Sequence, residues 1–436
     1  MSLFRSLFLK LLKEALARAF CSFSGLKVRV QVEEIHDLSF LTPTLVIANH
    51  QNDLDVPLIF SLLILHPSLK VPADKLCFVA EEDLFLPGYF PQHFLLSPLW
   101  ARLLFNFSLS KVLRSLGAFP VFKMTDLSLG RILRILKDNY GENLKIGEFL
   151  SQEGARLLSR LFHKGKEEVC SLTVKEALNW KYYRQLRLNL GSEILNENYA
   201  RSLREARIKA ALKQLEFFAS VLKERALVLF PEGEITQTGK IGTVRGGLYR
   251  IMEKAQWEPS IFPVTINYDF LGERRTLVVL GKPQRGPDLK TDRGEFSLRI
   301  QSLLKKGMRL MFSHVGSAAL YLLKRRKIAF FNEGYFEKVL AETLELVKRL
   351  GAEIDPALNN EYYLRSRCRN FWRFLRRKRY ILKVKGGFLL FWNFLDDFPD
   401  RVRNPVGYYY EKIQDFPFYP ELRAYIEEEK ELSLLT

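Results

Sequence analysis

The sequence predicts an α/β fold in which a mixed, mostly parallel sheet is flanked by helices. Two observations favour this fold class. Short apolar segments typical of strands alternate with longer segments in which apolar residues recur at helical spacing. In addition, 47% of the 436 residues are hydrophobic and 27% are charged, which is enough apolar material for a core and excludes a wholly disordered chain.

Residues 1–24 are expected to form an amphipathic helix. Apolar residues recur there at helical spacing, and Arg5, Lys10, Lys13 and Arg18 interrupt any signal-peptide core. A helix with a basic polar face can lie on a membrane surface. Packing of the same helix on the core of the main domain is an equally good interpretation.

The main α/β domain is expected over residues 25–315, and the alternation of segments places its elements. Strands are predicted at 26–34, 42–50, within 75–85, near 118–122, and at 226–230, 261–268 and 275–281. Helices are predicted at 56–65, at 97–117 before the strand near 118–122, and at 199–226.

Two regions depart from the alternation. Residues 140–200 are polar and carry no strand signal, which predicts a helical insertion. Residues 316–436 are expected to form a helical, basic C-terminal extension. Within it, residues 361–385 hold ten Lys/Arg and one acid, a net charge of +9. This segment is either a solvated basic helix face or a surface that binds an anionic partner.

The net charge of +18 points to anionic partners: nucleic acid, an anionic membrane or acidic small molecules. The 34 Phe residues favour lipid, and nucleic acid is not expected because no RNP, KH or zinc-finger signature is present. The longest apolar run, Val56 to Leu62, is too short to span a bilayer. The four cysteines form no CxxC pair, which is typical of a reducing, cytoplasmic compartment.

The first candidate for chemistry is the segment Asn49-His50-Gln51-Asn52-Asp53-Leu54-Asp55. His50 lies where an apolar strand meets a helix, the place where reacting groups gather in α/β sheets. Asp55 is one helical turn further on and can hydrogen-bond the imidazole. A histidine held by a carboxylate has a fixed tautomer and is a general base for a hydroxyl. Alone, this pattern also fits a structural histidine.

The second candidate, Leu229-Phe230-Pro231-Glu232-Gly233-Glu234-Ile235-Thr236, follows another apolar strand. Together the two segments resemble the glycerolipid acyltransferase superfamily, whose members include glycerol-3-phosphate and 1-acylglycerol-3-phosphate (lysophosphatidate) acyltransferases. Two further blocks of the resemblance are GAFPVFK at 117–123 and IFPVTI at 261–266, with Pro263 in position.

The resemblance implies the roles of the matched residues. His50 is the catalytic base and Asp55 orients it. The residues implied in substrate binding are Lys123, Glu232, Gly233, Thr236 and Arg245. Lys123 and Ile235 stand where the family usually has arginines, and lysine does not reproduce bidentate phosphate recognition. Lys240, Arg245 or Arg250 is a possible replacement.

The implied reaction is direct transfer of a fatty acyl group from a thioester, acyl-CoA or acyl carrier protein, to the hydroxyl of lysophosphatidate. Glycerol-3-phosphate is the alternative acceptor. No covalent intermediate, resident cofactor or metal is expected, since no GxSxG or HExxH motif is present. Because lipids are substrates, the expected location is cytoplasmic, peripheral on an anionic membrane surface. A non-catalytic lipid-binding module of the same fold and a nucleic-acid-binding protein are the competing interpretations.

Overall fold

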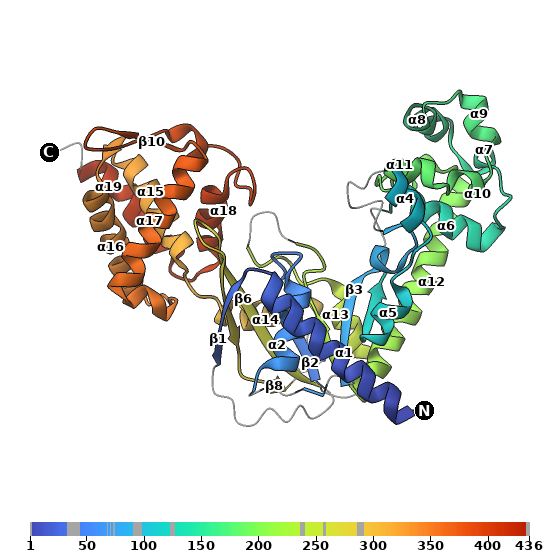
Figure 1. Cartoon of the computed structure of the whole chain (residues 1–436), viewed down its shortest axis with the longest axis horizontal. Coiled ribbons are helices and arrows are strands. Elements are labelled where there is room, and N and C mark those ends of the chain that lie inside the picture. The colour runs from blue at the N-terminus through green and yellow to red at the C-terminus, as the bar shows by residue number, and fades with distance from the viewer. Residues whose placement is uncertain are drawn as a thin grey trace. The chain divides into compact units, whose positions relative to one another are not determined.

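The computed structural model describes residues 2–32, 44–67, 69, 71–72, 75–89, 98–122, 127–235, 240–255, 259–285 and 292–432. It confirms the predicted fold class: a mixed, mostly parallel sheet is flanked by helices (Figure 1). The chain forms two compact units, the first made of residues 1–9 and 76–227 and the second of residues 10–75 and 228–436. The division by sequence into 1–24, 25–315 and 316–436 stays a prediction.

Each strand expected from the sequence is present in the main sheet. Its strands are β1 (Lys27–Val32), β2 (Thr44–Ala48), β3 (Leu76–Glu81), β4 (Ala118–Val121), β5 (Ala226–Leu229), β6 (Ser260–Asp269), β7 (Arg275–Leu280) and β8 (Gln284–Arg285). The order is β1-β7-β6-β2-β5-β3-β4, with β8 beside β6. The β1–β7, β2–β6 and β3–β4 pairs are parallel, whereas β6 and β7 form an antiparallel pair.

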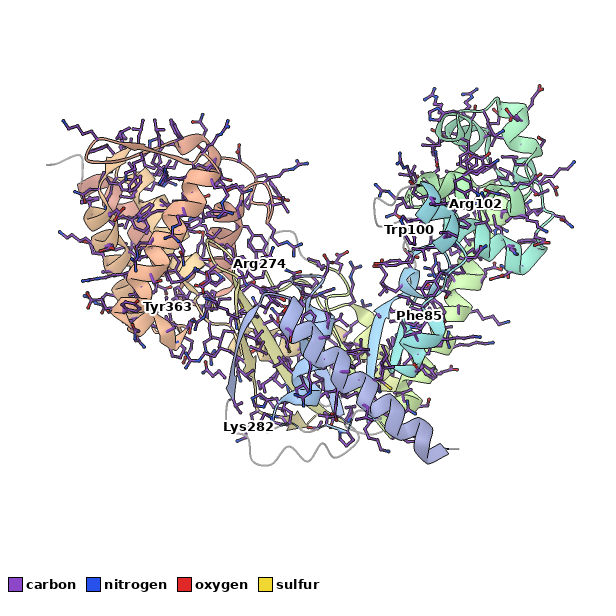
Figure 2. The ribbon with its side chains drawn as sticks, in the orientation of Figure 1. Phe85, Trp100, Arg102, Arg274, Lys282 and Tyr363 are labelled. Carbon is purple, nitrogen blue, oxygen red and sulfur yellow. The ribbon has the colours of Figure 1, made fainter. Side chains whose placement is uncertain are left out.

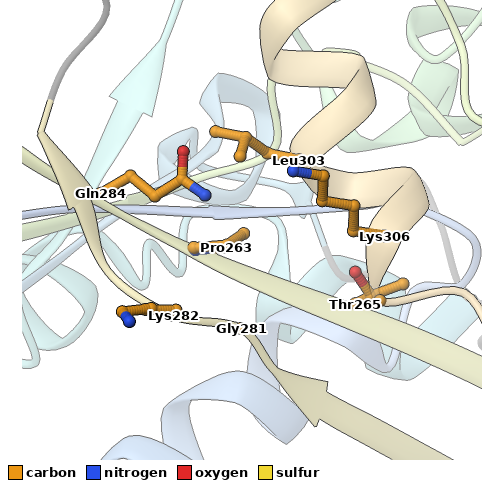
Figure 3. A pocket seen from close by; sticks show the side chains of 8 residues that line it. Pro263, Thr265, Gly281, Lys282, Gln284, Leu303 and Lys306 are labelled. Carbon is orange, nitrogen blue, oxygen red and sulfur yellow. The ribbon is translucent and has the colours of Figure 1, made fainter. Parts of the chain in front are cut away.

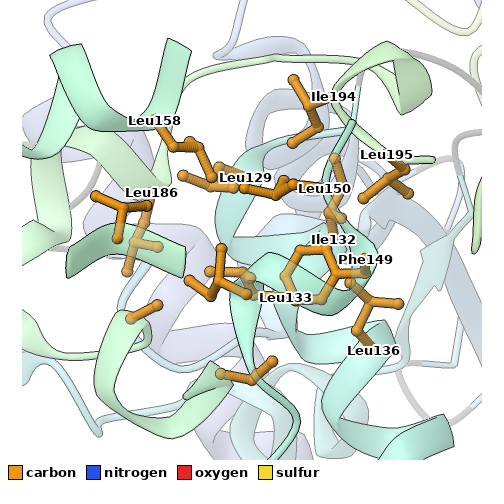
Figure 4. Close-up of a cluster of buried hydrophobic side chains, with 14 of the residues drawn as sticks. Leu129, Ile132, Leu133, Leu136, Phe149, Leu150, Leu158, Leu186, Ile194 and Leu195 are labelled. Atoms are coloured by element: carbon orange, nitrogen blue, oxygen red, sulfur yellow. The ribbon is translucent and has the colours of Figure 1, made fainter. Parts of the chain in front are cut away.

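The first unit contains the predicted helical insertion. Its helices are α4 (Pro98–Leu104), α5 (Ser110–Ser115), α6 (Leu129–Tyr140), α7 (Ile146–Phe149), α8 (Gln152–Phe162), α9 (Lys166–Ser171), α10 (Val174–Ala177), α11 (Tyr183–Leu186) and α12 (Glu197–Leu222). Leu129, Ile132, Leu133 and Leu136 form one side of α6 and meet Phe149 in a shared apolar core (Figure 4). The insertion thus packs with α6 around one shared apolar core.

The helix expected over 97–117 is two helices, α4 and α5, separated by residues 105–109. The hydroxyl of Ser108 donates to the carbonyl of Phe85 (2.8 Å) and accepts from the N–H of Ser110 (3.1 Å). A serine that binds nearby backbone groups competes with helix continuation, which explains the interruption.

The second unit holds α1 from Lys10 onward and the remaining helices. They are α1 (Ser2–Phe23), α2 (Asp55–Leu65), α13 (Gly246–Ala255), α14 (Arg293–Lys306), α15 (Phe312–Arg325), α16 (Glu333–Arg349), α17 (Glu361–Arg377), α18 (Pro405–Lys412) and α19 (Tyr419–Leu432). Within the parts of the chain that the structure describes, no helix is both long and apolar enough to cross a bilayer.

The C-terminal extension is helical, as expected, but it also contains a small antiparallel sheet that the sequence analysis missed. Its strands are β9 (Phe330–Phe331), β10 (Ile381–Val384) and β11 (Gly387–Leu390), in the order β10-β11-β9. The basic segment 361–385 is therefore α17 followed by β10. Gly386, at φ 85°, makes the tight turn between β10 and β11.

The basic helix α17 is anchored by one of its arginines. Arg367 is buried, and its Nη2 lies 2.6 Å from Oδ1 of Asp269 at the end of β6, while its Nη1 lies 3.2 Å from Glu273. Arg365, Arg369, Arg373, Arg376 and Arg377 are exposed. Most of the positive charge of this helix thus faces solvent, and one arginine ties it to the sheet.

Candidate active site

The His50 segment lies in the second unit, in the loop from β2 to α2. β2 runs parallel to β6, with Ala48 opposite Val264. Beyond the last strand pair, the buried amide of Asn49 continues the pairing: its Nδ2 donates to the carbonyl of Ile266 (3.0 Å) and its Oδ1 accepts the N–H of the same residue (2.7 Å). The chain therefore leaves the sheet at a fixed point, immediately before His50.

Asp55 is fully buried at the first position of α2 and accepts hydrogen bonds on both carboxylate oxygens. Its Oδ2 accepts the backbone N–H groups of Gln51 (2.6 Å) and Asn52 (2.8 Å) and lies 3.0 Å from Nδ1 of His50. Its Oδ1 accepts the hydroxyl of Tyr268. Burial, together with the charge of Asp55, raises the pKa of Tyr268 well above its usual value, so the hydroxyl remains a donor.

The expected hydrogen bond between His50 and Asp55 is thus formed. Because a carboxylate oxygen only accepts, the proton is assigned to Nδ1 of His50, and Nε2 carries the lone pair. Across the described residues, Nε2 has no hydrogen-bond partner. The imidazole stacks on Phe230 (ring centroids 4.4 Å apart), and its side chain is 19% exposed. One ring nitrogen is held, and the other is open to a ligand.

Glu232 connects the two predicted segments. Its side chain is buried, Oε1 accepts the backbone N–H of His50 (2.8 Å), and Oε2 accepts the N–H of Gly242 (2.7 Å). Burial raises the pKa of Glu232 to about 7, although the two backbone hydrogen bonds act in the opposite direction. Both carboxylate oxygens of Glu232 thus accept hydrogen bonds within the protein, and they connect the loop of His50 to the loop of Gly242. A contact of Glu232 with substrate stays a prediction.

Gly233, in the second segment, lies beside Arg245. Gly233 has φ 74°, and a Cβ there would lie 3.1 Å from Cγ of Arg245. The exposed guanidinium of Arg245 donates to the carbonyl of Glu232 (3.2 Å) and pairs with Glu234 (2.6 Å). The guanidinium that the resemblance assigns to substrate binding is thus paired with Glu234. A contact between Arg245 and substrate therefore also stays a prediction.

Two residues of the C-terminal extension reach the His50 loop, and the sequence analysis missed both. Nζ of Lys412 donates to Oε1 of Gln51 (2.7 Å), and Nη1 of Arg401 donates to the carbonyl oxygen of Gln51 (2.7 Å). Lys412 is fully buried, and burial lowers its pKa to about 8. No local pattern distinguishes these two cations from the many others in the extension.

The same extension also holds the loop that follows Gly233. Lys240 pairs with Glu411 (2.9 Å), and the backbone N–H of Ile241 donates to Oδ2 of Asp415 (2.6 Å). The His50 loop is therefore bound to α18 and to the turn before it, and residues 240–241 are bound to α18 and to the turn after it.

Lys123 and Thr236 lie outside the described residues, so their predicted roles remain predictions. The block that ends in Lys123 belongs to the first unit. There the N–H of Phe122 donates to Oε1 of Gln214 on α12 (2.9 Å), and the side-chain amide of Gln214 donates back to the carbonyl of Pro120. The end of β4 is thus fixed to α12.

A cavity of about 160 Å³ lies in the second unit between β6, β7 and α14 (Figure 3). Its lining includes Pro263, Thr265, Lys282 and Lys306, and none of the predicted catalytic residues. Pro263, the matched residue of the fourth block, thus faces this cavity. Within the described part of the chain, no group of three or more His, Cys, Asp or Glu side chains could hold a metal ion.

No protein-family profile matches this sequence, and no curated protein matches it. Among solved structures, the chain is similar to the 1-acyl-sn-glycerophosphate (LPA) acyltransferase PlsC from Thermotoga maritima, with 15% sequence identity and a TM-score of 0.33. The similarity covers 70% of this chain and 79% of that chain. A functional assignment must therefore rest on the geometry of the site itself.

Proposed function

We propose that the protein is an O-acyltransferase that moves a fatty acyl group from a thioester to the hydroxyl of lysophosphatidate. One observation carries this proposal: Nδ1 of His50 lies 3.0 Å from the buried carboxylate of Asp55, while Nε2 has no partner among the described residues. An imidazole oriented in this way is a general base for a hydroxyl group.

In the proposed reaction, Nε2 of His50 takes the proton of the acceptor hydroxyl. The oxygen attacks the thioester carbonyl, the new C–O bond forms, and the C–S bond breaks as the tetrahedral intermediate collapses. The proton passes from His50 to the departing thiolate, so the base is regenerated. Asp55 acts as a positioning residue, because it holds the imidazole and stabilises its cationic form.

Exposed apolar and basic side chains on α4 and α5 support binding to a membrane surface. Leu99, Trp100 and Leu103 are 66%, 56% and 62% exposed, and no acidic residue occurs between 98 and 122. Figure 2 shows Trp100 and Arg102 on the same helix, α4. An apolar surface with basic neighbours suits the interface of an anionic bilayer, where Trp is enriched. We call Leu99, Trp100 and Leu103 the α4 patch.

An acyl-transfer assay tests the function directly. The purified protein is incubated with radiolabelled oleoyl-CoA or oleoyl-acyl carrier protein and with lysophosphatidate, glycerol-3-phosphate or lysophosphatidylcholine. We expect time-dependent formation of phosphatidate from lysophosphatidate. Transfer to glycerol-3-phosphate alone would mean that glycerol-3-phosphate, and not lysophosphatidate, is the acceptor. The proposed reaction type would then still hold. No transfer to any acceptor from either donor would refute the proposal in favour of a lipid-binding module.

A further inference from the structure

Arg401 places a guanidinium group beside the His50 loop. It belongs to the turn over residues 400–404, and its Nη1 donates to the carbonyl oxygen of Gln51, the residue after His50, at 2.7 Å. This single contact uses one of the five N–H donors of the guanidinium. The arginine side chain is half-buried, so its charge is less screened than that of a fully exposed arginine.

The turn that carries Arg401 is held at several points. Oδ1 of Asp400 accepts the backbone N–H groups of Val402 (2.8 Å) and Arg403 (2.7 Å), and the backbone of Asp400 pairs with that of Asn404. The hydroxyl of Tyr380 donates to the carbonyl of Arg403 (2.9 Å). A group on such a fixed turn loses little conformational freedom when a ligand binds.

No carboxylate among the described residues pairs directly with Arg401, although its charge interacts with that of the neighbouring Asp400. In the described part of the chain Arg401 forms no ion pair, and the two buried carboxylates of the site have other donors. Asp55 accepts hydrogen bonds from two backbone N–H groups of its own loop and from the hydroxyl of Tyr268. Glu232 accepts hydrogen bonds from two backbone N–H groups. The remaining N–H donors of Arg401 are thus available to an anion from outside the protein.

Tyr408 adds a second donor. Its side chain is 3% exposed, and its hydroxyl makes no hydrogen bond to any residue that the structure describes. Tyr408 stands one helical turn before Lys412 on α18, and the amine of Lys412 donates to Gln51 in the His50 loop. The charges of Arg401, Asp55 and Glu232 also act on the Tyr408 hydroxyl. Burial raises the pKa of Tyr408, which keeps the hydroxyl protonated and able to donate.

From this geometry, we propose that Arg401 and Tyr408 form a binding site for a phosphate monoester, the headgroup of the acceptor. This rests on the proposed function, because the site would bring the acceptor's hydroxyl to Nε2 of His50. A planar guanidinium fork matches two oxygens of a phosphate, and a hydroxyl donor can satisfy a third.

Binding and kinetics test the two proposals separately. The first measurement is calorimetric binding of glycerol-3-phosphate, with glycerol and inorganic phosphate as comparison ligands, to the wild type and to Arg401→Ala, Arg401→Lys and Tyr408→Phe. Arg403→Ala is the matched control, because Arg403 is exposed in the same turn and its side chain forms no hydrogen bond or ion pair within the described residues.

We expect Arg401→Ala to weaken binding of glycerol-3-phosphate about tenfold or more, since charge-assisted hydrogen bonds are lost. Arg401→Lys and Tyr408→Phe are expected to have smaller effects, and Arg403→Ala to bind as the wild type does. Inorganic phosphate should follow the same order and glycerol should not bind. Unchanged binding by Arg401→Ala, or no binding of either phosphate to the wild type, would overturn the site.

The second measurement separates phosphate binding from support of the loop. Arg401→Ala should raise KM about tenfold for a phosphorylated acceptor and leave KM for the thioester unchanged. Its effect on kcat/KM for monoacylglycerol should be much smaller, because only the support that Arg401 gives to Gln51 is lost there. An equal loss with both acceptors would mean that Arg401 only holds Gln51, and a change in the thioester KM alone would assign the site to the donor; either result overturns the proposal. If the wild type shows Arg401-dependent phosphate binding but no acyl transfer, the proposed function fails and the anion site stands.

Discussion

Nζ of Lys412 donates a 2.7 Å hydrogen bond to Oε1 of Gln51, a residue 361 positions earlier in the chain. The backbone N–H of Gln51 in turn donates to Asp55, the carboxylate that holds His50. The end of α18 therefore supports the loop on which the candidate base depends. This makes the C-terminal extension part of the site's framework, and its loss should affect the geometry around His50.

We predict that His50→Ala removes nearly all acyl transfer and leaves the fold intact. Loss of a positioned base typically lowers the rate about 10²–10⁴-fold. The imidazole is partly exposed, and Asp55 keeps its hydrogen bonds to Gln51, Asn52 and Tyr268. Turnover and a thermal melt are measured together. His163→Asn is the control, because His163 is exposed with φ 53°, which asparagine tolerates. More than about a tenth of wild-type activity in His50→Ala would exclude the proposed mechanism.

For Glu232→Gln we expect lower activity together with a pH-dependent change in stability. An amide has one acceptor oxygen, so either His50 or Gly242 loses its partner and one loop is released. The pKa of Glu232 is about 7 when folded and about 4.5 when unfolded, so the folded wild type binds more protons between these values. The contribution of Glu232 to the free energy of unfolding of the wild type therefore falls as the pH rises from 4.5 to 7.

The variant lacks this titration, so its Tm relative to the wild type should rise between pH 5 and pH 8. Differential scanning fluorimetry across that range measures the difference. A constant difference would mean that Glu232 is ionised throughout and that its hydrogen bonds outweigh its burial.

The local pattern of the sequence was sufficient for strands β1 to β7 of the main sheet and for the pairing of His50 with Asp55, but it missed the two-residue strand β8. Those features depend on alternating apolar residues and on a spacing of five positions, which are local properties. Tyr268 also had a signal, since it stands at the carboxyl end of a strand beside the one that leads to His50. Its contact with Asp55 follows from the parallel pairing of β2 and β6.

Other features had no local signal. Lys412 and Arg401 reach Gln51 only because the chain returns to the same loop after about 350 residues. Burial of a lysine is also contrary to its usual exposed position, so no sequence pattern would place Lys412 in the interior. Glu232 was expected to contact substrate. Its hydrogen bonds to the backbone N–H groups of His50 and Gly242 depend on how the fold brings these two loops together, which the sequence pattern does not indicate.

Lys412→Met tests whether the buried amine titrates as its surroundings imply. The pKa of Lys412 is lowered to about 8 by burial, against about 10.5 in the unfolded chain. Between these values the unfolded chain binds more protons than the folded one, so wild-type stability from this group rises with pH. The variant cannot gain this stability. The Tm of the wild type minus that of Lys412→Met should therefore increase from pH 8 to pH 10, measured by scanning fluorimetry.

Acyl transfer by Lys412→Met should also fall, because Gln51 loses the donor that holds its side chain. Lys338→Met provides the comparison for loss of a lysine on a different helix, α16. If the Tm difference for Lys412→Met is flat with pH, the amine keeps its proton when buried and its interaction with nearby carboxylates outweighs the cost of burial.

Membrane binding is predicted to have two separable parts. Arg376 and Arg377 at the end of α17 and Arg379 just after it are exposed. Each cation near an anionic surface contributes about 1 kcal/mol that salt screens. The α4 patch contributes apolar burial, which salt does not weaken. We therefore expect strong binding to phosphatidylglycerol-containing vesicles, weaker binding to phosphatidylcholine vesicles, and partial release by high salt.

Two sets of variants distinguish these parts by co-sedimentation with both kinds of vesicle. Changing Arg376, Arg377 and Arg379 to Glu should remove most of the salt-sensitive binding, because the local charge is reversed. Changing the α4 patch to Ser should remove the salt-resistant binding to both vesicle types. Leu298→Ser is the matched control, since Leu298 is 67% exposed on α14, and it should bind as the wild type does. Equal binding of the wild type to neutral and anionic vesicles would contradict the electrostatic part. Undiminished high-salt binding by the α4 variant would show that other apolar side chains contact the bilayer.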